Sequence, residues 1–298
     1  MGALNLLITG AGGTLGRATL EAALARGHRV RALVRRPGAL AGAETIICDL
    51  AQPGPTLAEA LAGIDVVLHL AASLTGDEAT HQRDTLDATR NLYAALPAGI
   101  PVVLASSMAV YEGRSGHIDE ASPLEGNPAG RDAYMRAKLA QEQIARAHSD
   151  TPTTILRIGA LTGPGHEWNA HIGLRFGPVA LRLGGRGALP TVRLEDAAEA
   201  LVLAAEAAPK AQIFNIIGDN LPNCRTYLAQ IAQKPRLTLP LPWQSLLPLA
   251  ELVSALKLPV PGLLRPATLR YRFAARSYAN GRAKRALGWQ PGPWEGQA

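Results

Sequence analysis

The stretch that decides the fold lies near the start of the chain and reads Thr9-Gly10-Ala11-Gly12-Gly13-Thr14-Leu15-Gly16. An apolar run at residues 4–9 precedes it, and a helical pattern at residues 15–26 follows at once. Glycines at 10, 13 and 16 let the backbone turn tightly, approach a pyrophosphate and pack the helix close to a strand. The free N–H groups of the helix start would then face the phosphates. A purely structural turn is the alternative, but the position between strand and helix favours a dinucleotide site.

Short apolar runs alternate with helical patterns through the first half of the chain. The expected strands are residues 4–9, 29–34, 45–48, 66–70, 101–105 and 153–159, and the expected helices are 15–26, 56–61, 81–96 and 132–147. This alternation predicts right-handed βαβ units and a parallel sheet covered by helices on both faces. The expected fold class is therefore α/β, a Rossmann-like doubly wound parallel sheet.

The alternation breaks after residue 159. Residues 161–190 are rich in glycine and proline, and we expect them to form a long loop that faces a ligand. We therefore place a dinucleotide-binding Rossmann domain at residues 1–160 and a mainly substrate-binding lobe at 161–298. Within that lobe, residues 191–217 have the pattern strand, helix, strand, so we expect them to return to the Rossmann domain.

The composition limits the classes of protein to which the chain can belong. Of the 298 residues, 47% are hydrophobic and 18% are charged, which excludes general disorder. Thirty basic against 24 acidic residues give a net charge of +6, but the basic residues are scattered, so no nucleic-acid partner is expected. Two cysteines, Cys48 and Cys224, cannot build a disulfide framework or a four-ligand zinc site, so we expect no metal and a cytoplasmic protein. No uninterrupted apolar stretch is long enough to span a membrane, so no membrane partner is expected.

The end of the second expected strand, Leu33-Val34-Arg35-Arg36, bears on the choice of dinucleotide. NAD sites usually carry an acidic residue there to bind the ribose hydroxyls, whereas Val34 is apolar. The Arg35 guanidinium can pair with a 2′-phosphate and stack on adenine, which favours NADP over NAD, with an exposed basic turn as the alternative. Asp49, directly after the third strand, is either an acceptor for the adenine amino group or a turn residue.

Four further motifs follow in order along the chain. They are His69-Leu70-Ala71-Ala72, Ser106-Ser107-Met108-Ala109-Val110-Tyr111, Tyr134-Met135-Arg136-Ala137-Lys138 and Ala283-Lys284-Arg285-Ala286-Leu287-Gly288-Trp289-Gln290-Pro291. Together with the glycine stretch they resemble the extended short-chain dehydrogenase/reductase family, of the NAD-dependent epimerase/dehydratase type. Val34-Arg35 and Asp49-Leu50 look most like its dihydroflavonol-reductase and 3β-hydroxysteroid-dehydrogenase branches.

The resemblance implies that Ser107, Tyr134 and Lys138 are catalytic. Tyr134 and Lys138 are four residues apart, which places both on one face of a helix. Tyr134 would protonate a carbonyl as general acid with its pKa lowered by the Lys138 ammonium, and Ser107 would hydrogen-bond the same oxygen. In the family, this lysine also holds the nicotinamide ribose. The residues expected to bind the cofactor are Gly10, Gly12, Gly13, Thr14, Leu15, Gly16, Arg35, Asp49, Leu50, Leu70, Ala71, Ala72, Tyr134 and Lys138.

Departures from the family pattern narrow the expected function. Thr85 stands where an asparagine usually supports the active site, and Ala160 stands where many sugar-nucleotide members carry asparagine. Met108 and Ala109 occupy the positions of the acid pair that dehydratases use. We therefore expect an NAD(P)-dependent oxidoreductase, with NADP favoured and NAD possible, that transfers a hydride between the cofactor and a fairly apolar carbonyl or alcohol substrate. A nucleotide-sugar epimerase is the alternative enzyme. A catalytically silent regulator that senses a dinucleotide is the alternative that is not an enzyme.

Two segments leave the nature of the substrate open. His166 and His171, within residues 161–190, either face the substrate or serve packing. Residues 237–264 are apolar and broken by prolines, which suggests a hydrophobic small-molecule substrate. The same residues can equally form the core of the lobe or a subunit contact, so a homodimer is possible.

Overall fold

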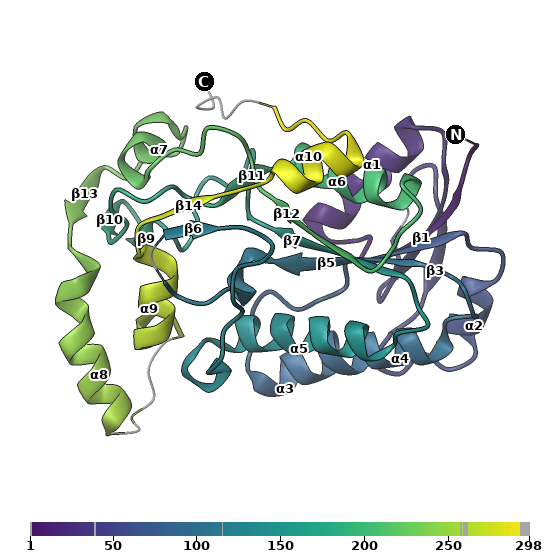
Figure 1. Cartoon of the computed structure of the whole chain (residues 1–298), viewed down its shortest axis with the longest axis horizontal. Helices are drawn as coiled ribbons and strands as arrows, with labels where there is room; N and C mark the ends of the chain where they lie inside the picture. Colours follow the sequence, from purple (N-terminus) through teal and green to yellow (C-terminus); the bar gives the residue numbers. More distant parts are fainter. Residues whose placement is uncertain (1, 39, 115, 257, 259–261, 293–298) are drawn as a thin grey trace.

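The structure is a computed structural model that describes residues 2–38, 40–114, 116–256, 258 and 262–292 (Figure 1). Its central strands are β1 (Asn5–Thr9), β2 (Arg29–Val34), β3 (Glu44–Ile47), β4 (Val66–His69), β5 (Val102–Ser107), β7 (Thr153–Ile158) and β12 (Gln212–Ile216). They form one seven-stranded sheet in the order β12-β7-β5-β4-β1-β2-β3, and every neighbouring pair is parallel. The strand order reverses its direction between β1 and β4, which confirms the doubly wound α/β fold.

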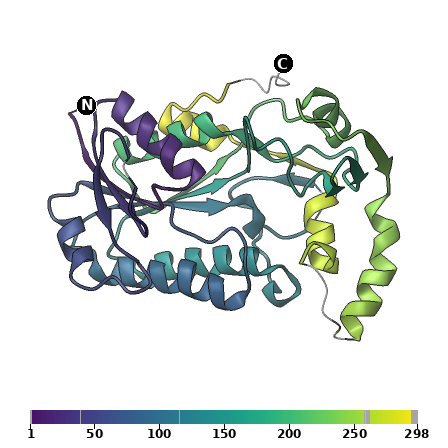
Figure 2. The same cartoon turned by 180° about the vertical axis from the view of Figure 1, so that it is seen from behind.

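Helices cover both faces of this sheet, as Figures 1 and 2 show. One face carries α1 (Thr14–Ala25), α6 (Leu194–Glu206) and α10 (Gly281–Leu287), and the other carries α2 (Thr56–Leu61), α3 (Glu78–His81), α4 (Ala88–Ala95) and α5 (Ala133–Ala147). Strand β1 shows how the sequence divides its side chains between the two layers. Leu6 and Ile8 pack into the core beneath α1 and α6, whereas Leu7, between them, packs into the core beneath α2 and α4.

The helix expected at residues 81–96 is present, but it is not a regular α-helix. A π-helical segment, Gln82–Asp87, lies between α3 and α4. Thr85 is buried in this segment, and its Oγ1 accepts the N–H of Ser73 at 3.0 Å. Its main-chain carbonyl accepts the Thr89 hydroxyl at 2.6 Å. Thr85 thus ties the loop after β4 to the helical layer. Such π-helical turns occur frequently at functional sites.

Residues 161–190 do not form the expected long loop. Strand β8 (Ala160–Thr162) pairs with β11 (Thr191–Arg193), and β9 (Gly173–Phe176) pairs with β10 (Val179–Arg182) as an antiparallel hairpin. The expectation is wrong because Gly177, at φ +57°, closes a tight turn between β9 and β10. Strand β13 (Leu237–Pro240) then extends this hairpin into a three-stranded sheet.

The C-terminal part of the chain lies partly beyond the main sheet and partly against it. Helices α7 (Cys224–Gln230), α8 (Leu247–Ala255) and α9 (Pro266–Phe273) lie beyond the end of the main sheet with β13, and β14 (Arg276–Tyr278) pairs with β6 (Gly116–Ile118) (Figure 1). Helix α10 returns to the main sheet beside β12. Trp289, which follows α10, is fully buried, and its indole N–H donates to the Asp196 carbonyl at 2.8 Å.

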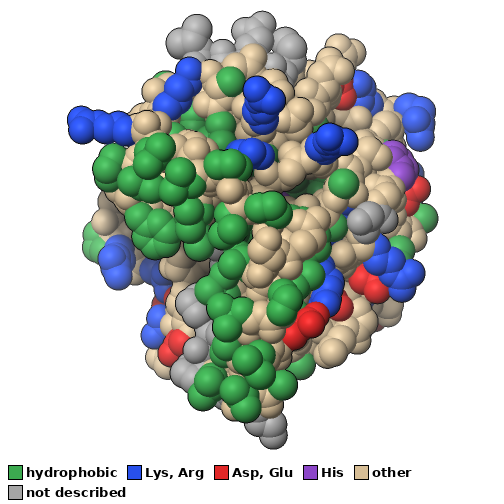
Figure 3. Space-filling model, turned by 90° about the vertical axis from the view of Figure 1, so that its left-hand side faces the viewer, with side chains coloured by type: hydrophobic (Ala, Val, Ile, Leu, Met, Phe, Trp, Pro, Cys, Tyr) green, Lys and Arg blue, Asp and Glu red, His purple; other side chains and the backbone are tan. Residues whose placement is uncertain are grey.

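The apolar residues around α8 divide between core and surface. Leu246, Leu247 and Ala250 pack with side chains of α9, so this part of the stretch belongs to the lobe's own core. Leu249 and Leu252 on the other side of α8 are 62% and 58% exposed. Figure 3 shows apolar side chains gathered on this face of the molecule. None of the helices in the described ranges combines the length and the apolar composition that a membrane span requires.

Gly16 is packed so closely against the turn before α1 that a side chain has no room there. A Cβ atom at residue 16 would lie 2.2 Å from the Gly10 carbonyl oxygen and 2.7 Å from Ala11 Cα. Alanine favours a helix by roughly 0.5–1 kcal/mol over glycine. We nevertheless expect Gly16→Ala to lower the free energy of unfolding by about 1–3 kcal/mol, because the turn must open. Urea unfolding measures the change.

Gly12→Ala is the matched control. A Cβ atom there would meet only Val34 Cγ1, at an ordinary contact distance of 3.8 Å. Its free energy of unfolding should therefore stay close to that of the wild type. Equal stability of the Gly16→Ala and Gly12→Ala variants would contradict the tight packing of α1 on its turn.

Candidate active site

A cavity of about 820 Å³ lies at the carboxyl ends of the central strands. This is the crevice in which open α/β sheets bind their ligands. The structure brings together around it every residue predicted from the sequence. The lining residues include Gly10, Gly12, Gly13, Thr14, Leu15, Gly16, Arg35, Asp49, Leu50, Leu70, Ala71, Ala72, Ser107, Tyr134 and Lys138.

The glycine turn forms one wall of the cavity and fits a pyrophosphate. Helix α1 begins after Gly13, which has no side chain to cap the first N–H groups, and the first turn carries no acidic residue. Such a helix end attracts an anion. Gly10 has φ +70°, and a Cβ atom there would lie 2.9 Å from the main-chain nitrogen of Ala71. A side chain at residue 10 would therefore push apart the two loops that border the cavity.

The far end of the same wall carries an ion pair that the sequence did not reveal. Arg35 Nη1 lies 2.8 Å from Asp84 Oδ2, and Arg83 also bonds Asp84, at 2.7 Å. The hydrogen bonds from Arg83 and Arg35 lower the pKa of Asp84 against the opposing effect of burial. Asp84 lies on the π-helical segment, far from Arg35 along the chain, so no local pattern indicates the pair. Asp49 Oδ1 accepts the Ala51 N–H at 3.0 Å, as a turn residue does, and Asp49 also lines the cavity.

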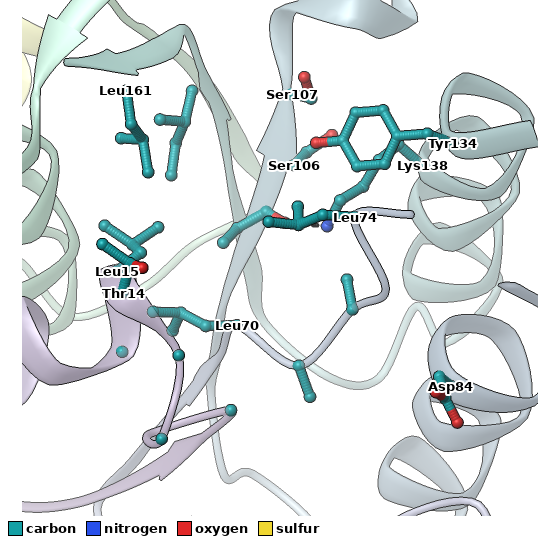
Figure 4. Close-up of a pocket in the computed structure, with 18 of the residues that line it drawn as sticks. Thr14, Leu15, Leu70, Leu74, Asp84, Ser106, Ser107, Tyr134, Lys138 and Leu161 are labelled. Carbon is teal, nitrogen blue, oxygen red and sulfur yellow. Dashed lines mark hydrogen bonds between the residues drawn. The ribbon is translucent and has the colours of Figure 1, made fainter. Parts of the chain in front are cut away.

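The opposite wall carries the three predicted catalytic residues. Figure 4 shows the Tyr134 ring reaching from α5 toward Ser106 and Ser107 at the end of β5, with Thr14 and Leu15 across the cavity. Ser107 Oγ accepts the Ala109 N–H at 3.2 Å, and the Ser107 side chain lies near enough to Tyr134 to act on the pKa of its phenol. Two hydroxyl groups therefore lie together at one place in the cavity, where an oxygen of a ligand can bond to both.

The structure changes the expected electrostatics of Tyr134. Burial raises the pKa of its phenol, while the Ser107 side chain and the charge of Arg272 act in the opposite direction. The expected lowering by Lys138 is wrong, because the Lys138 ammonium is turned to other partners. Its Nζ donates to the Ala105 carbonyl at 2.8 Å and to Gln141 Oε1 at 2.9 Å. Tyr134 is therefore held in its protonated form.

Lys138 is the first member of a buried series of hydrogen bonds that runs from α5 to β1. Gln141 donates from Nε2 to Thr89 Oγ1 at 2.9 Å, and His69 Nε2 lies 2.9 Å from the same oxygen. His69 Nδ1 lies 2.8 Å from the hydroxyl of Thr9, which ends β1. Lys138 is thereby connected, through side chains alone, to the strand that leads into the glycine turn.

The direction of each bond in this series follows from its neighbours. Thr9 Oγ1 accepts two main-chain N–H groups after β4, at 3.2 Å each, so its own proton goes to His69 Nδ1. Burial lowers the pKa of His69 to about 3, with the Lys138 charge acting the same way, so the ring is neutral. His69 Nε2 then carries the proton and donates to Thr89. Gln141 lies three residues after Lys138, on the same face of the helix. This spacing is the signal in the sequence that could have indicated the contact between Lys138 and Gln141.

Comparison with known proteins agrees with the geometry of the cavity. The family model of the NAD dependent epimerase/dehydratase family matches residues 6–216. The chain belongs to this family. The resemblance inferred from the motifs is thereby confirmed.

Two of the relatives that the chain matches are named as reductases. The chain is 29% identical over 306 residues to a 3-diazoavenalumate denitrifying reductase from a Streptomyces species, covering 97% of this chain and 96% of the relative. It is 32% identical to a 2-alkyl-3-oxoalkanoate reductase from Stenotrophomonas maltophilia (strain K279a), covering 70% and 67%. The solved structure of MoeE5 in complex with UDP-glucuronic acid and NAD shares the fold, with a TM-score of 0.75, 22% identity and coverage of 98% and 96%.

The other end of the cavity in this family member is built by the lobe. His166, Asn169 and His171 line it, so the two histidines that the sequence left open both face the cavity. Tyr271 and Arg272 of α9 complete this end. Sequence reasoning missed the two α9 residues because they carry no motif and approach only through the packing of the lobe. Among the described residues of 237–264 none lines the cavity, so this stretch gives no support to a hydrophobic substrate.

The buried Lys138 should make stability depend on pH. Burial lowers the pKa of Lys138 to about 8, below the ordinary value of about 10.4. Between these values the unfolded chain holds a proton that the folded chain has released, so the free energy of unfolding rises with pH. We expect the wild type to gain about 1–2 kcal/mol relative to Lys138→Met between roughly pH 7 and pH 9.5. Urea unfolding across this range measures the difference, and parallel profiles would show that Lys138 keeps an ordinary pKa.

Proposed function

We propose that the protein is an NADP-dependent reductase that converts a ketone or aldehyde to an alcohol and then releases its cofactor. The observation that carries the proposal is the meeting of Tyr134, Ser107 and Lys138 in the same cavity as the glycine turn. A protein that only sensed a dinucleotide would not need this set. The names of the reductase relatives support the same reaction class.

The residues of the chain divide the binding and the proton chemistry between them. The α1 terminus and the glycine turn would hold the pyrophosphate, and residues 70–72 would border the nicotinamide half. A bound nicotinamide dinucleotide supplies the hydride. Ser107 and Tyr134 would hydrogen-bond the carbonyl oxygen of the substrate. Tyr134 is a protonated acid because burial raises its pKa, so it can give its proton to that oxygen as the alcohol forms.

Lys138 has a positioning and a binding part in this proposal. Its ammonium is held by the Ala105 carbonyl and Gln141, which keeps it on the cavity side of α5 next to Tyr134. From there it can donate to the ribose hydroxyls of the nicotinamide half. The hydrogen-bonded chain through Gln141 and Thr89 keeps this amine in place, since each member has its partners satisfied.

We expect NADPH to bind at least tenfold more tightly than NADH, a difference of about 1.4 kcal/mol. Val34 offers no acid to the ribose, and Arg35 and Arg36 both line the cavity where a 2′-phosphate would lie. Arg35→Asp should abolish or reverse the preference because it removes a guanidinium and adds a carboxylate. Titration of both cofactors by nicotinamide fluorescence measures the ratio.

Arg90→Asp is the matched control for charge, because Arg90 pairs with Asp87 on the exposed side of α4 and does not line the cavity. This variant should keep the wild-type preference. Equal affinities of the wild type for NADPH and NADH would refute the NADP assignment. Full NADPH preference in the Arg35→Asp variant would place the phosphate site elsewhere.

The reaction class can be tested on the purified protein with a panel of ketones and aldehydes. We expect it to arrive free of tightly held cofactor and to oxidise added NADPH in step with carbonyl reduction. Tyr134→Phe should lower turnover by about 10²–10⁴-fold with NADPH binding nearly intact, because the ring is kept and only the proton donor is lost. Tyr93→Phe is the control, since it also removes a buried phenol but one bonded to Thr153 and outside the cavity.

The alternative reactions have distinct outcomes in the same assay. An epimerase would retain its dinucleotide through purification and interconvert a nucleotide sugar with no net change in nicotinamide absorbance. NADPH binding without oxidation by any carbonyl compound would instead favour a sensor. Undiminished reduction by the Tyr134→Phe variant would mean that another group gives the proton.

A further inference from the structure

The lobe end of the cavity holds a concentration of positive charge. Three arginines surround Tyr271: the Arg131 guanidinium lies 4.2 Å from its ring centre, that of Arg276 lies 4.8 Å away, and Arg272 is its neighbour in α9. Of these three, only Arg272 lines the cavity. Its backbone carbonyl lies 3.3 Å from Nδ1 of His171, which lines the same end.

The two arginines behind Tyr271 are engaged with the protein. Arg131 pairs with Glu125 at 2.9 Å and donates to the Ala109 carbonyl at 3.1 Å. Arg276 donates to the carbonyls of Arg114 and Arg270, at 2.6 Å and 3.2 Å. Their hydrogen bonds hold the two guanidinium groups around the Tyr271 ring, so their charge is a fixed part of this end of the cavity.

Arg272 is engaged only loosely. Its Nη2 lies 3.6 Å from Asp132 Oδ2, which is too far for a hydrogen bond. Its Nε is buried and, in the described part of the chain, has no hydrogen-bond partner. Buried guanidinium donors without acceptors are costly, and a ligand that supplies the acceptors removes this cost. Arg131 Nε and Arg276 Nη1 also have no partner among the described residues, but of the three arginines only Arg272 lines the cavity, so its guanidinium is the one that a ligand there can reach.

The surrounding charges favour an anion at this place. Among the described residues, Asp132 and Glu125 are the carboxylates that pair with these three arginines, which leaves an excess of one positive charge. His171 adds no charge, because burial lowers its pKa to about 3 and the charges of Arg272, Arg276 and Arg131 act in the same direction. A site that disfavours a further cation in this way stabilises a negatively charged group.

We propose that Arg272 binds a carboxylate of the substrate, so that the protein prefers carbonyl compounds that carry a carboxylate to neutral ones. The planar guanidinium matches the two oxygens of a carboxylate, and Arg272 lies close enough to Tyr134 for its charge to act on the phenol. The cavity thus joins a proton donor for the carbonyl oxygen to an anchor for the acid group. This inference rests on the proposed reductase function and adds the class of substrate to it.

The test compares acids with their esters. The protein with saturating NADPH is assayed with 2-oxooctanoate and 4-oxooctanoate, each beside its methyl ester. We expect kcat/KM to be about 10- to 100-fold higher for the preferred acid than for its ester. Arg272→Met should lower kcat/KM for that acid by a similar factor, mostly through KM, and lower it for the ester by a smaller factor, because the Arg272 charge also acts on Tyr134. Arg272→Lys should restore part of the loss, because lysine keeps the positive charge but lacks the planar guanidinium that can bond both carboxylate oxygens.

Arg270→Met is the matched control on the same helix. Arg270 pairs with Glu251 at the surface and does not line the cavity, so this variant should keep the preference for acids. Equal kcat/KM for acids and esters in the wild type would overturn the inference. An equal loss for acid and ester in Arg272→Met would also overturn it, since it would show a purely structural role. Preference for a phosphate-bearing ketone over both acids would reassign the anion to a phosphate.

A binding measurement separates this inference from the reductase proposal. If no carbonyl compound is reduced, the reductase proposal fails, and calorimetric titration of 3-hydroxyoctanoate and its methyl ester into the NADPH-loaded protein tests the anchor alone. Tighter binding of the acid than of the ester, lost in Arg272→Met and kept in Arg270→Met, supports the anchor. Equal binding of acid and ester overturns it.

Discussion

The buried ion pair between Glu142 of α5 and Arg157 of β7 is the contact on which the active-site wall depends. Arg157 donates to both carboxylate oxygens, at 3.0 Å and 2.8 Å, and Ser106 at the end of β5 donates to the same carboxylate at 2.6 Å. Burial would raise the pKa of Glu142, but the bonds from Arg157, Ser106 and Arg146 hold it below its ordinary range. Breaking such a pair leaves an unpaired buried charge, which costs about 3–5 kcal/mol. The helix that carries Tyr134 and Lys138 is therefore fixed in place over two central strands.

Helix α5, held in this way, places the other polar groups of the site. Glu142 is one helical turn after Lys138, so both face the sheet, and Gln141 between them carries the bonded chain to His69 and β1. The wall that would hold the substrate and the turn that would hold the pyrophosphate are thus parts of one buried polar network. Networks of this kind stabilise a single arrangement because each group that loses its partner is left unsatisfied in the protein interior.

The two ends of the cavity have different electrostatic character, and the difference has a structural cause. At the Arg35 end, Asp84 already pairs with the guanidinium, and both side chains lie at the surface or close to it. At the lobe end, Arg131 and Arg276 are buried beside Tyr271, and the buried Nε of Arg272 has no hydrogen-bond partner among the described residues. Charges act more strongly where water is excluded. The lobe therefore contributes charged side chains as well as a wall to the proposed substrate site.

The sequence alone determined the main sheet, its helices, the glycine turn and the group of residues that meets at the sheet edge. It could do so because a parallel sheet places the carboxyl ends of its strands at one edge, so strand order and local motifs are sufficient to bring Gly10, Ser107 and Tyr134 together. The tertiary structure decided what these patterns do not encode: the partners of Lys138, the pairing of Arg35 with Asp84, the hairpin at Gly177 and the approach of Arg272. Each of these contacts joins segments through packing, or depends on burial, and burial also reversed the expected direction of the Tyr134 pKa. The spacing of residues along the sequence does not show which distant groups come into contact, nor how strongly burial removes them from water.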